Sequence, residues 1–203
     1  MKIICIGRNY SDHAKEMNSP VPTEPVIFMK PDTALLKDNA PFYYPEFTQD
    51  LHHEVEIVLK ISKVGKHIAE QFAHKYYSEI GLGIDFTARD LQAECKKQGL
   101  PWEKAKAFDN SAPIGEFVSI DQLKDKNKID FHLDVNGKTV QHGNTSDLIF
   151  SYDQLIAYIS KFVTLRMGDL IYTGTPAGVG PVKIGDRLEG YMEGKKMFDF
   201  VVK

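Results

Sequence analysis

The pattern of hydrophobic and polar positions along the chain predicts more strand than helix. One long segment alternates apolar and polar residues, as a half-buried strand does, and two short apolar runs are typical of buried strands. Asn136 and Gly137 are a strong signal for a hairpin turn between two further segments. The predicted strands are residues 2–6, 53–64, 80–84, 131–135 and 138–140.

Helices are expected where stop and start signals bracket helical periodicity. Thr87, followed three residues later by Asp90, resembles a capping box, and Gly99 before Pro101 is a normal helix end. The segment Ser19-Pro20-Val21-Pro22 stops the first helix, and an irregular, Pro-rich stretch follows it as far as Pro45. The predicted helices are residues 11–17, 69–78, 87–98 and 151–162.

The last of these helices is amphipathic, with an apolar stripe that predicts one buried face. The stripe consists of Tyr152, Leu155, Ile156, Ile159 and Phe162. Because strands and helices do not alternate regularly, a doubly wound sheet is disfavoured. We expect an α+β fold, mostly β, with a mixed sheet and a few short helices. The length of 203 residues, with 42% hydrophobic and 26% charged residues, fits one domain over residues 1–203.

Charge and cysteine content narrow the classes of function. A net charge of −3 gives no general attraction to nucleic acid or to an anionic membrane, and no apolar stretch has membrane-spanning length. Cys5 and Cys95 form no CxxC pair, so neither a disulfide nor a zinc framework is indicated. We therefore expect a cytoplasmic protein whose partner is a small molecule, with no nucleic acid and no membrane.

Three acidic residues are candidates for a metal site. Glu54 and Glu56 are two apart on a predicted strand and so share a face, with Cα atoms roughly 6.5–7 Å apart. Asp85 follows a predicted buried strand, at a position where functional groups often collect. Three carboxylates without a sulfur ligand suit Mg²⁺ or Mn²⁺. For the Glu54–Glu56 pair alone, a solvated strand face is the alternative.

Zinc has one superficial argument in its favour. His52, His53 and Glu54 resemble the start of an H-E-x-x-H motif. The second histidine of that motif falls at position 57, which is Ile, so the motif is absent.

Several further residues have chemistry that suits a small acid. Arg89 and Gln92 lie three apart on a predicted helix, so they share a face that can bind a carboxylate. Lys106 has small and apolar neighbours, which favours a partly buried ammonium able to stabilise an oxyanion. The alternative for Arg89 and Lys106 is a side chain that simply reaches solvent.

A histidine and a glutamate form the last candidate pair. His13 and Glu16 are three apart on the first predicted helix, so the carboxylate can orient the imidazole for water activation; a surface ion pair is the alternative. The glycine-rich loop at residues 173–181 lacks a phosphate-binding pattern but can present backbone amides and the Thr175 hydroxyl to a carboxylate. An ordinary tight turn is the alternative for this loop.

Taken in order, these motifs resemble the fumarylacetoacetate hydrolase family, in particular its short branch of acylpyruvate hydrolases and oxaloacetate decarboxylases. The matching segments span nearly the whole chain. They are Gly7-Arg8-Asn9-Tyr10 with His13 and Glu16, Phe28-Met29-Lys30-Pro31, His53-Glu54-Val55-Glu56, Gly83-Ile84-Asp85-Phe86-Thr87-Ala88-Arg89-Asp90, Lys106-Ala107-Phe108-Asp109, Gly143-Asn144-Thr145-Ser146-Asp147 and Thr173-Gly174-Thr175-Pro176.

The resemblance implies a mixed β-sandwich roll, a homodimer, and one Mg²⁺ or Mn²⁺ per subunit. It implies three groups of site residues: metal ligands Glu54, Glu56 and Asp85; catalytic residues His13, Glu16 and Lys106; and substrate-binding residues Arg89, Gln92 and Thr175. Where longer members have a further acidic ligand, this chain has Ile4-Cys5-Ile6, and it lacks their amino-terminal domain. Both departures favour the short branch.

The function expected from the sequence is hydrolysis of a carbon–carbon bond in an acylpyruvate-type 2,4-dioxo acid, which gives a carboxylic acid and pyruvate. Decarboxylation of oxaloacetate, and keto–enol or double-bond isomerisation as in a 2-hydroxyhepta-2,4-diene-1,7-dioate isomerase, pass through a similar enolate, so they stay open. A non-catalytic metal–dicarboxylate binding module is the alternative from another class. It has no use for His13, Glu16 and Lys106. Residues 8–20 are a candidate lid over the site.

Overall fold

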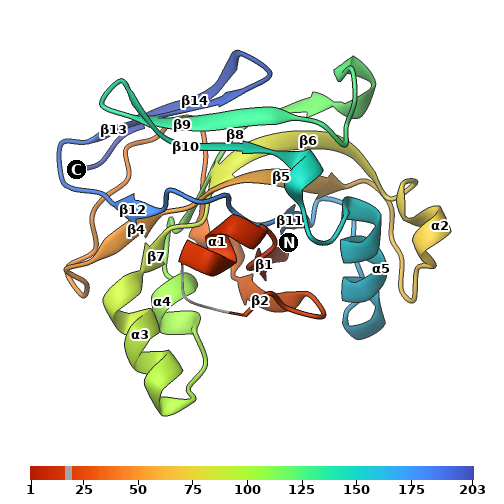
Figure 1. Ribbon diagram of the computed structural model, residues 1–203, viewed down its shortest axis with the longest axis horizontal. Coiled ribbons are helices and arrows are strands. Elements are labelled where there is room, and N and C mark those ends of the chain that lie inside the picture. The colour runs from red at the N-terminus through yellow and green to blue at the C-terminus, as the bar shows by residue number, and fades with distance from the viewer. Residues whose placement is uncertain (17–19) are drawn as a thin grey trace.

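A computed structural model describes residues 1–16 and 20–203 of the chain. Within these residues the largest sheet has seven strands in the order β2-β1-β11-β5-β6-β8-β3 (Figure 1). Its strands are β1 (Ile3–Gly7), β2 (Val26–Lys30), β3 (Leu35–Leu36), β5 (Val55–Ile61), β6 (Tyr77–Ile84), β8 (Ala112–Ser119) and β11 (Leu170–Tyr172).

Two smaller sheets complete the β structure of the described residues. A four-stranded antiparallel sheet has the order β10-β9-β13-β14, and a three-stranded sheet has the order β12-β4-β7. Their strands are β4 (Leu51–His53), β7 (Thr87–Ala88), β9 (Asp130–Val135), β10 (Lys138–Asn144), β12 (Gly180–Pro181), β13 (Arg187–Met192) and β14 (Lys195–Val201).

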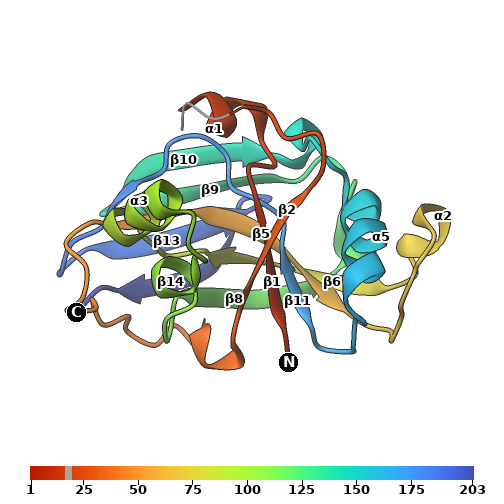
Figure 2. The ribbon, with the colours of Figure 1, turned by 90° about the horizontal axis from the view of Figure 1, so that it is seen from below.

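The helices are short and lie around the sheets, with α3 and α5 at opposite ends of the molecule (Figures 1 and 2). Among the described residues none is long and apolar enough to cross a membrane. Five are α-helices and three are 3₁₀ helices: α1 (Ser11–Glu16), α2 (Glu70–Ala73), α3 (Arg89–Gln98), α4 (Glu103–Lys106), α5 (Tyr152–Phe162), η1 (Asp32–Ala34), η2 (Ile120–Gln122) and η3 (Thr145–Asp147).

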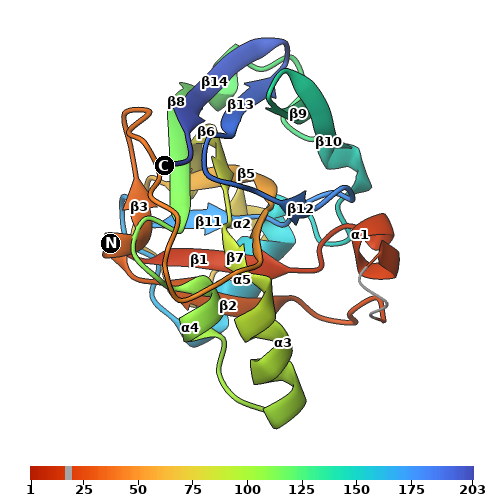
Figure 3. The ribbon, with the colours of Figure 1, turned by 90° about the vertical axis from the view of Figure 1, so that its left-hand side faces the viewer.

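The main hydrophobic core lies where the four-stranded sheet packs over the seven-stranded sheet. Figure 3 shows β13 and β14 above β6 and β8, and residues of these strands are in contact. Side chains from both sheets and from α5 are fully buried there, including Ile57, Leu82, Leu133, Leu155 and Leu188. The fold is therefore mostly β, with a curled mixed sheet and few short helices, as predicted.

Local sequence signals were reliable where they were strong. β9 and β10 form the predicted hairpin, and Asn136 and Gly137 at its turn have the positive φ angles of 53° and 75° that this turn requires. Helix α5 has the predicted position, and its Ser151 N-cap forms a capping box with Gln154. Helix α3 ends at Gly99, which has a left-handed conformation with φ 67°.

Four predictions about elements need correction or lie outside the described residues. The helix predicted at 69–78 has only the four residues of α2, because Tyr77 already pairs with Ile61 as part of β6. The strand predicted at 53–64 is interrupted at Glu54 and ends at Ile61. Phe162, predicted on the buried stripe of the last helix, is 61% exposed. Residue 17, the predicted end of the first helix, and the Ser19 of its stop signal lie outside the described residues.

The capping box predicted at Thr87 is also wrong. Thr87 belongs to strand β7, and its hydroxyl donates to the Asp85 carbonyl at 3.3 Å. Asp90 accepts hydrogen bonds from the Thr48 hydroxyl at 2.6 Å and from the Gln49 amide at 3.0 Å. The start of α3 is therefore held by the segment before β4, which lies some forty residues earlier in the chain.

Candidate metal and substrate site

Three carboxylates converge at the end of the β5–β6 strand pair. Glu56 lies on β5, Glu54 lies in the one-residue gap between β4 and β5, and Asp85 follows β6 directly. The Asp85 amide donates to the Glu54 carbonyl at 2.8 Å, which extends the pairing of the two strands past their ends. One carboxylate oxygen from each residue lies within 4.8 Å of the others, and all three residues are buried. The predicted cluster is therefore present.

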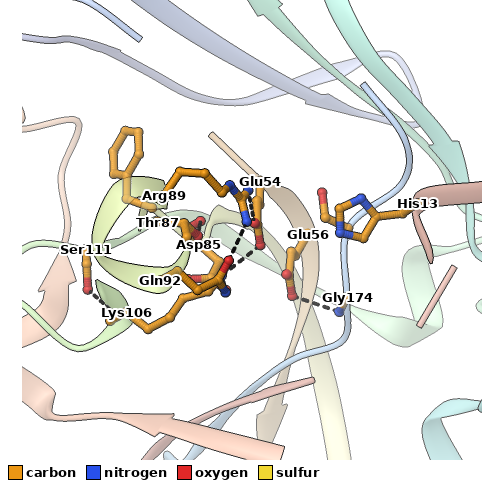
Figure 4. A network of polar contacts seen from close by, with 12 residues as sticks. His13, Glu54, Glu56, Asp85, Thr87, Arg89, Gln92, Lys106, Ser111 and Gly174 are labelled. Atoms are coloured by element: carbon orange, nitrogen blue, oxygen red, sulfur yellow. Dashed lines mark hydrogen bonds and ion pairs between the residues drawn. The ribbon is translucent and has the colours of Figure 1, made fainter. Parts of the chain in front are cut away.

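Cationic side chains lie on one side of this cluster, where Figure 4 shows Arg89 and Lys106. Lys106 Nζ lies 2.7 Å from Asp85 Oδ2 and 2.9 Å from Glu54 Oε2. Arg89 Nη2 donates to Glu54 Oε1 at 2.6 Å. Lys30 Nζ lies 2.8 Å from Asp85 Oδ1, and its side chain is fully buried. The ammonium predicted for Lys106 is thus buried and bound to two of the three predicted metal ligands.

Burial and neighbouring charges oppose each other at Glu54 and Lys106 and act together at Glu56. Burial disfavours ionisation of Glu54, but the charges of Lys106 and Arg89 outweigh it, so the pKa of Glu54 is lowered. Burial also disfavours the ammonium of Lys106, and Asp85 and Glu54 outweigh it, so the pKa of Lys106 is raised. For Glu56, burial and then the charges of Asp85 and Glu54 raise the pKa well above its ordinary value. Of the three carboxylates, Glu56 has the fewest neighbouring groups that stabilise its ionised form.

The donor set fits a hard divalent cation. Asp85 Oδ1 is buried and accepts no hydrogen bond, although Lys30 Nζ is close to it. Within the described part of the chain Glu56 has no cationic partner, and its Oε2 accepts one hydrogen bond, from the Gly174 amide at 2.7 Å. The thiol of Cys5 is buried, which raises its pKa, and it is not among the groups that converge on one point in the described residues. Oxygen ligands alone suit Mg²⁺ or Mn²⁺.

His13 and Glu16 of α1 form the predicted pair. His13 Nδ1 and Glu16 Oε2 are 3.2 Å apart, and His13 is 5% exposed. The other oxygen of Glu16, Oε1, accepts from the Gly178 amide at 3.0 Å. Figure 4 shows His13 on the opposite side of Glu56 from Arg89 and Lys106. An acid–base group and a set of cations therefore face each other across the carboxylates.

The glycine-rich loop after β11 presents two backbone amides to carboxylates, and both carboxylates belong to the protein itself. The Gly174 amide donates to Glu56 and the Gly178 amide donates to Glu16, so these two amides bind protein carboxylates. Thr175 lines the cavity, but its hydroxyl donates to the Val55 carbonyl at 2.8 Å. The loop thus links the acidic cluster to the His13–Glu16 pair.

The face of α3 predicted to bind substrate does line the cavity. Arg89 Nη1 donates to Gln92 Oε1 at 2.8 Å, which fixes the orientation of the Gln92 amide. The amide nitrogen of Gln92 then remains available as a hydrogen-bond donor. All of the predicted site residues except Glu16 line this one cavity.

Sequence reasoning missed residues that hold the site together. Lys30 Nζ donates to the backbone carbonyls of Phe86, Lys106 and Ser111. Its position at the end of an apolar run, before Pro31, was the available signal.

Gln141 and Asn9 were missed as well. Gln141 accepts from the Val55 amide at 3.0 Å and donates to Thr175 Oγ1 at 2.8 Å, so it joins β5 to the glycine-rich loop. Asn9 is fully buried and bonds Phe150 and Thr173, which joins the end of β1 to the same loop. No local pattern distinguishes Gln141 from an exposed strand residue.

Comparison with known proteins identifies the family. A family model described as fumarylacetoacetate (FAA) hydrolase C-terminal matches residues 2–201. The chain belongs to the fumarylacetoacetate hydrolase family. Membership makes it an enzyme of this family and leaves the non-catalytic binding module without support.

Two curated relatives and one solved structure are similar over nearly their whole length. The mitochondrial oxaloacetate tautomerase FAHD1 of Mus musculus is 47% identical over 201 residues, which cover 99% of this chain and 91% of that protein. Oxaloacetate tautomerase YcgM of Escherichia coli (strain K12) is 44% identical over 197 residues, 97% of this chain and 90% of that protein. The fumarylpyruvate hydrolase of Pseudomonas aeruginosa, solved in complex with Mn²⁺ and pyruvate, is 37% identical with a TM-score of 0.94, covering 100% of this chain and 89% of that one. This chain therefore lies in the short branch of the family.

Proposed function

We propose that this chain is a metal-dependent enzyme that interconverts the enol and keto forms of oxaloacetate. One observation carries the proposal: the Glu54–Glu56–Asp85 cluster has an acid–base group, His13, on one side and cations on the other. Both curated relatives described above are named oxaloacetate tautomerases, and this supports isomerisation over the acylpyruvate hydrolysis expected from the sequence.

Glu54, Glu56 and Asp85 would hold the Mg²⁺ or Mn²⁺. When bound, such a cation withdraws electrons from the 2-oxo group and stabilises negative charge on its oxygen. Arg89 and Lys106 already pair with Glu54, so they keep that carboxylate ionised and ready to bind a cation.

The substrate would be held by α3 and by Lys106. The amide nitrogen of Gln92, fixed by Arg89, is positioned to donate to the carboxylate next to the oxo group. Lys106 lies beside Glu54 and Asp85, where its charge would favour the oxyanion of the enolate. Thr175 would close the cavity wall beside them.

Tautomerisation needs one proton to leave oxygen and one to reach carbon. In the enol-to-keto direction, the enol O–H bond breaks with loss of its proton to solvent, and protonated His13 gives a proton to C3 as the C=C bond becomes single. Glu16 holds His13 Nδ1, which leaves Nε2 for the transfer. In the reverse direction neutral His13 takes the C3 proton.

The direct test follows the loss of enol-oxaloacetate by ultraviolet absorbance, with pyruvate release measured in parallel. The expected result is a rate above that of buffer, abolished by EDTA and restored by Mg²⁺ or Mn²⁺. If pyruvate release accounts for all of the lost enol, the enzyme is a decarboxylase and the proposal is wrong.

Hydrolysis of an acylpyruvate is the second candidate, supported by the likeness to the fumarylpyruvate hydrolase of Pseudomonas aeruginosa. Here His13 and Glu16 would activate water to attack the distal carbonyl, which releases pyruvate. We predict that His13→Ala lowers both tautomerisation and hydrolysis by about 10²–10⁴-fold. Metal affinity, measured by calorimetry, should stay unchanged, because His13 is outside the carboxylate cluster. A variant that loses hydrolysis alone would contradict the role of His13 in proton transfer to carbon.

A further inference from the structure

Oxaloacetate has a second carboxylate, for which the residues named so far provide no partner. The inference here rests on the proposed function, because it concerns that distal carboxylate. Arg89 and Lys106 are the evident cations of the cavity, but both are already bound to Glu54, and Lys106 is bound to Asp85 as well. A distal anion therefore needs other positive groups.

Two further cations line the same cavity, Arg8 and Lys96. Among the ion pairs of residues 1–16 and 20–203, none joins either of them to a carboxylate. The catalytic scheme above uses neither residue. They are thus two positive charges at a substrate cavity, and no charged partner within the described chain occupies them.

Lys96 is positioned by the helix that carries Arg89 and Gln92. The three residues are spaced i, i+3 and i+7 on α3, so they lie along one helical face toward the cavity. Lys96 Nζ lies 5.5 Å from the centre of the Trp102 ring, which itself lies 5.9 Å from the ring of Phe28. These aromatic rings line the cavity and give the ammonium a fixed surface to rest on.

Arg8 is positioned by an unusual backbone conformation. Its φ angle is 60°, in the left-handed region that a long side chain rarely adopts. The next residue, Asn9, is fully buried and hydrogen-bonded to Phe150 and Thr173, which holds the chain in this conformation. Strained residues that surrounding structure enforces are concentrated at functional sites. The strain here directs the end of β1 so that Arg8 lines the cavity.

The charges of the cavity add to one another. The pKa of Lys96 is lowered, first by desolvation and then by the positive charges of Arg89, Lys106 and Arg8, against the opposing charge of Glu54. Repulsion among cations that face one cavity is relieved when an anion enters it.

We propose that Arg8 and Lys96 form a subsite for the distal carboxylate of a 2-oxo dicarboxylate. The proximal carboxylate and oxo group would lie at the acidic cluster, and the carbon chain would extend past Phe28 and Trp102. The subsite makes the enzyme selective for dianionic substrates over 2-oxo acids with an uncharged tail.

The test compares two ligands that do not turn over, difluorooxaloacetate and pyruvate. They share the proximal groups, and only the first has a distal carboxylate. Binding is measured by calorimetry on the Mg²⁺-loaded wild type and on the variants Arg8→Gln and Lys96→Gln. Lys97→Gln is the matched control, because Lys97 is the next residue in the sequence, is exposed and does not line the cavity. Loss of a charge-assisted hydrogen bond should weaken difluorooxaloacetate binding about tenfold in each of the first two variants. Pyruvate affinity and the control should be unchanged.

Two results would overturn the subsite: unchanged affinity for difluorooxaloacetate in both variants, or an equal loss for both ligands. Activity of the wild type toward enol-oxaloacetate is a separate measurement. If that activity is absent but the variants still lose affinity for the dicarboxylate alone, the subsite stands and the proposed function fails. Thermal unfolding of each variant, expected to match the wild type, shows that affinity was not lost through misfolding.

Discussion

Two clusters of ion pairs in this enzyme have similar distances and opposite surroundings. At the site, Lys106 lies 2.7 Å from Asp85, and the two side chains are 4% and 1% exposed. On the four-stranded sheet, Arg187 lies 2.6 Å from Asp199, and the two are 55% and 24% exposed. Ion-pair distance alone does not distinguish them. Burial does.

The difference shows which cluster needs a functional explanation. Burying charged groups costs hydration free energy, and the attraction between them offsets this cost only when their geometry is good. Exposed ion pairs change the stability of the fold little. A fold selected for stability alone has no reason to bury Glu54, Glu56 and Asp85 together with two lysines. Binding of a cation, as proposed above, would provide the reason, because Glu56 has no cationic partner among the described residues.

The largest expected effect is that of Glu56→Gln. It removes the carboxylate that has no cationic partner in the described chain and thus the one that depends most on a bound metal. We expect turnover of enol-oxaloacetate at limiting Mg²⁺ to fall about a thousandfold or more, because several kcal/mol of enolate stabilisation depends on the cation.

Stability should respond in the opposite direction to activity. In EDTA, Glu56→Gln should unfold at a urea concentration no lower than that of the wild type, because the variant buries a neutral amide in place of a crowded acid. Glu79→Gln is the matched control: Glu79 lies on the neighbouring strand in an exposed pair with Lys60, and its loss should alter neither metal affinity nor turnover. Clear destabilisation of Glu56→Gln in EDTA would mean that the acidic cluster is structural.

The next effect in size is that of Lys30→Met on stability. Lys30 Nζ binds three backbone carbonyls and faces Asp85, and methionine of similar length removes the ammonium from all four groups. We expect the free energy of unfolding in EDTA, measured with urea, to fall by about 3 kcal/mol. This value is at the lower end of the range for breaking a buried ion pair, because Lys106 still binds Asp85. Lys60→Met, at the exposed Lys60–Glu79 pair, should change it by less than about 1 kcal/mol. Equal effects would remove the distinction between the clusters.

The sequence predicted elements whose causes are local and missed those whose causes are distant. The hairpin at Asn136-Gly137 and the Ser151-capped helix have their signals within a few residues. Strand β8 was not predicted, because Pro113 and Gly115 look like strand breakers. In the fold a Cβ on Gly115 would meet the Met197 carbonyl at 2.3 Å. The glycine is therefore required by close contact with strand β14, which lies far along the chain.

The same division holds at the site. The period of a strand was enough to bring Glu54 and Glu56 together, and the spacing of a helix was enough for His13 with Glu16 and for Arg89 with Gln92. Lys30 and Gln141 act through partners more than thirty residues away, which no local pattern contains. The predicted homodimer, the cytoplasmic location and the single domain stay predictions.

The smallest effect is expected at the exposed cluster, and it depends on pH. Asp199 accepts from Arg187 Nε at 2.7 Å and Nη2 at 2.6 Å, and these bonds lower its pKa from 3.8 to about 2. Because the folded state holds this proton less tightly than the unfolded state, the carboxylate stabilises the fold above about pH 4, and this contribution is lost as the pH falls toward 2.

The wild type should therefore be slightly more stable than Asp199→Asn near pH 5, and this difference should shrink between about pH 4 and pH 2. It should also shrink in about 1 M salt, because salt screens exposed charges. Urea unfolding at several pH values measures it. The loss caused by Lys30→Met should persist in the same salt, because buried charges are screened far less. If salt weakens both effects equally, burial is not what separates the two clusters.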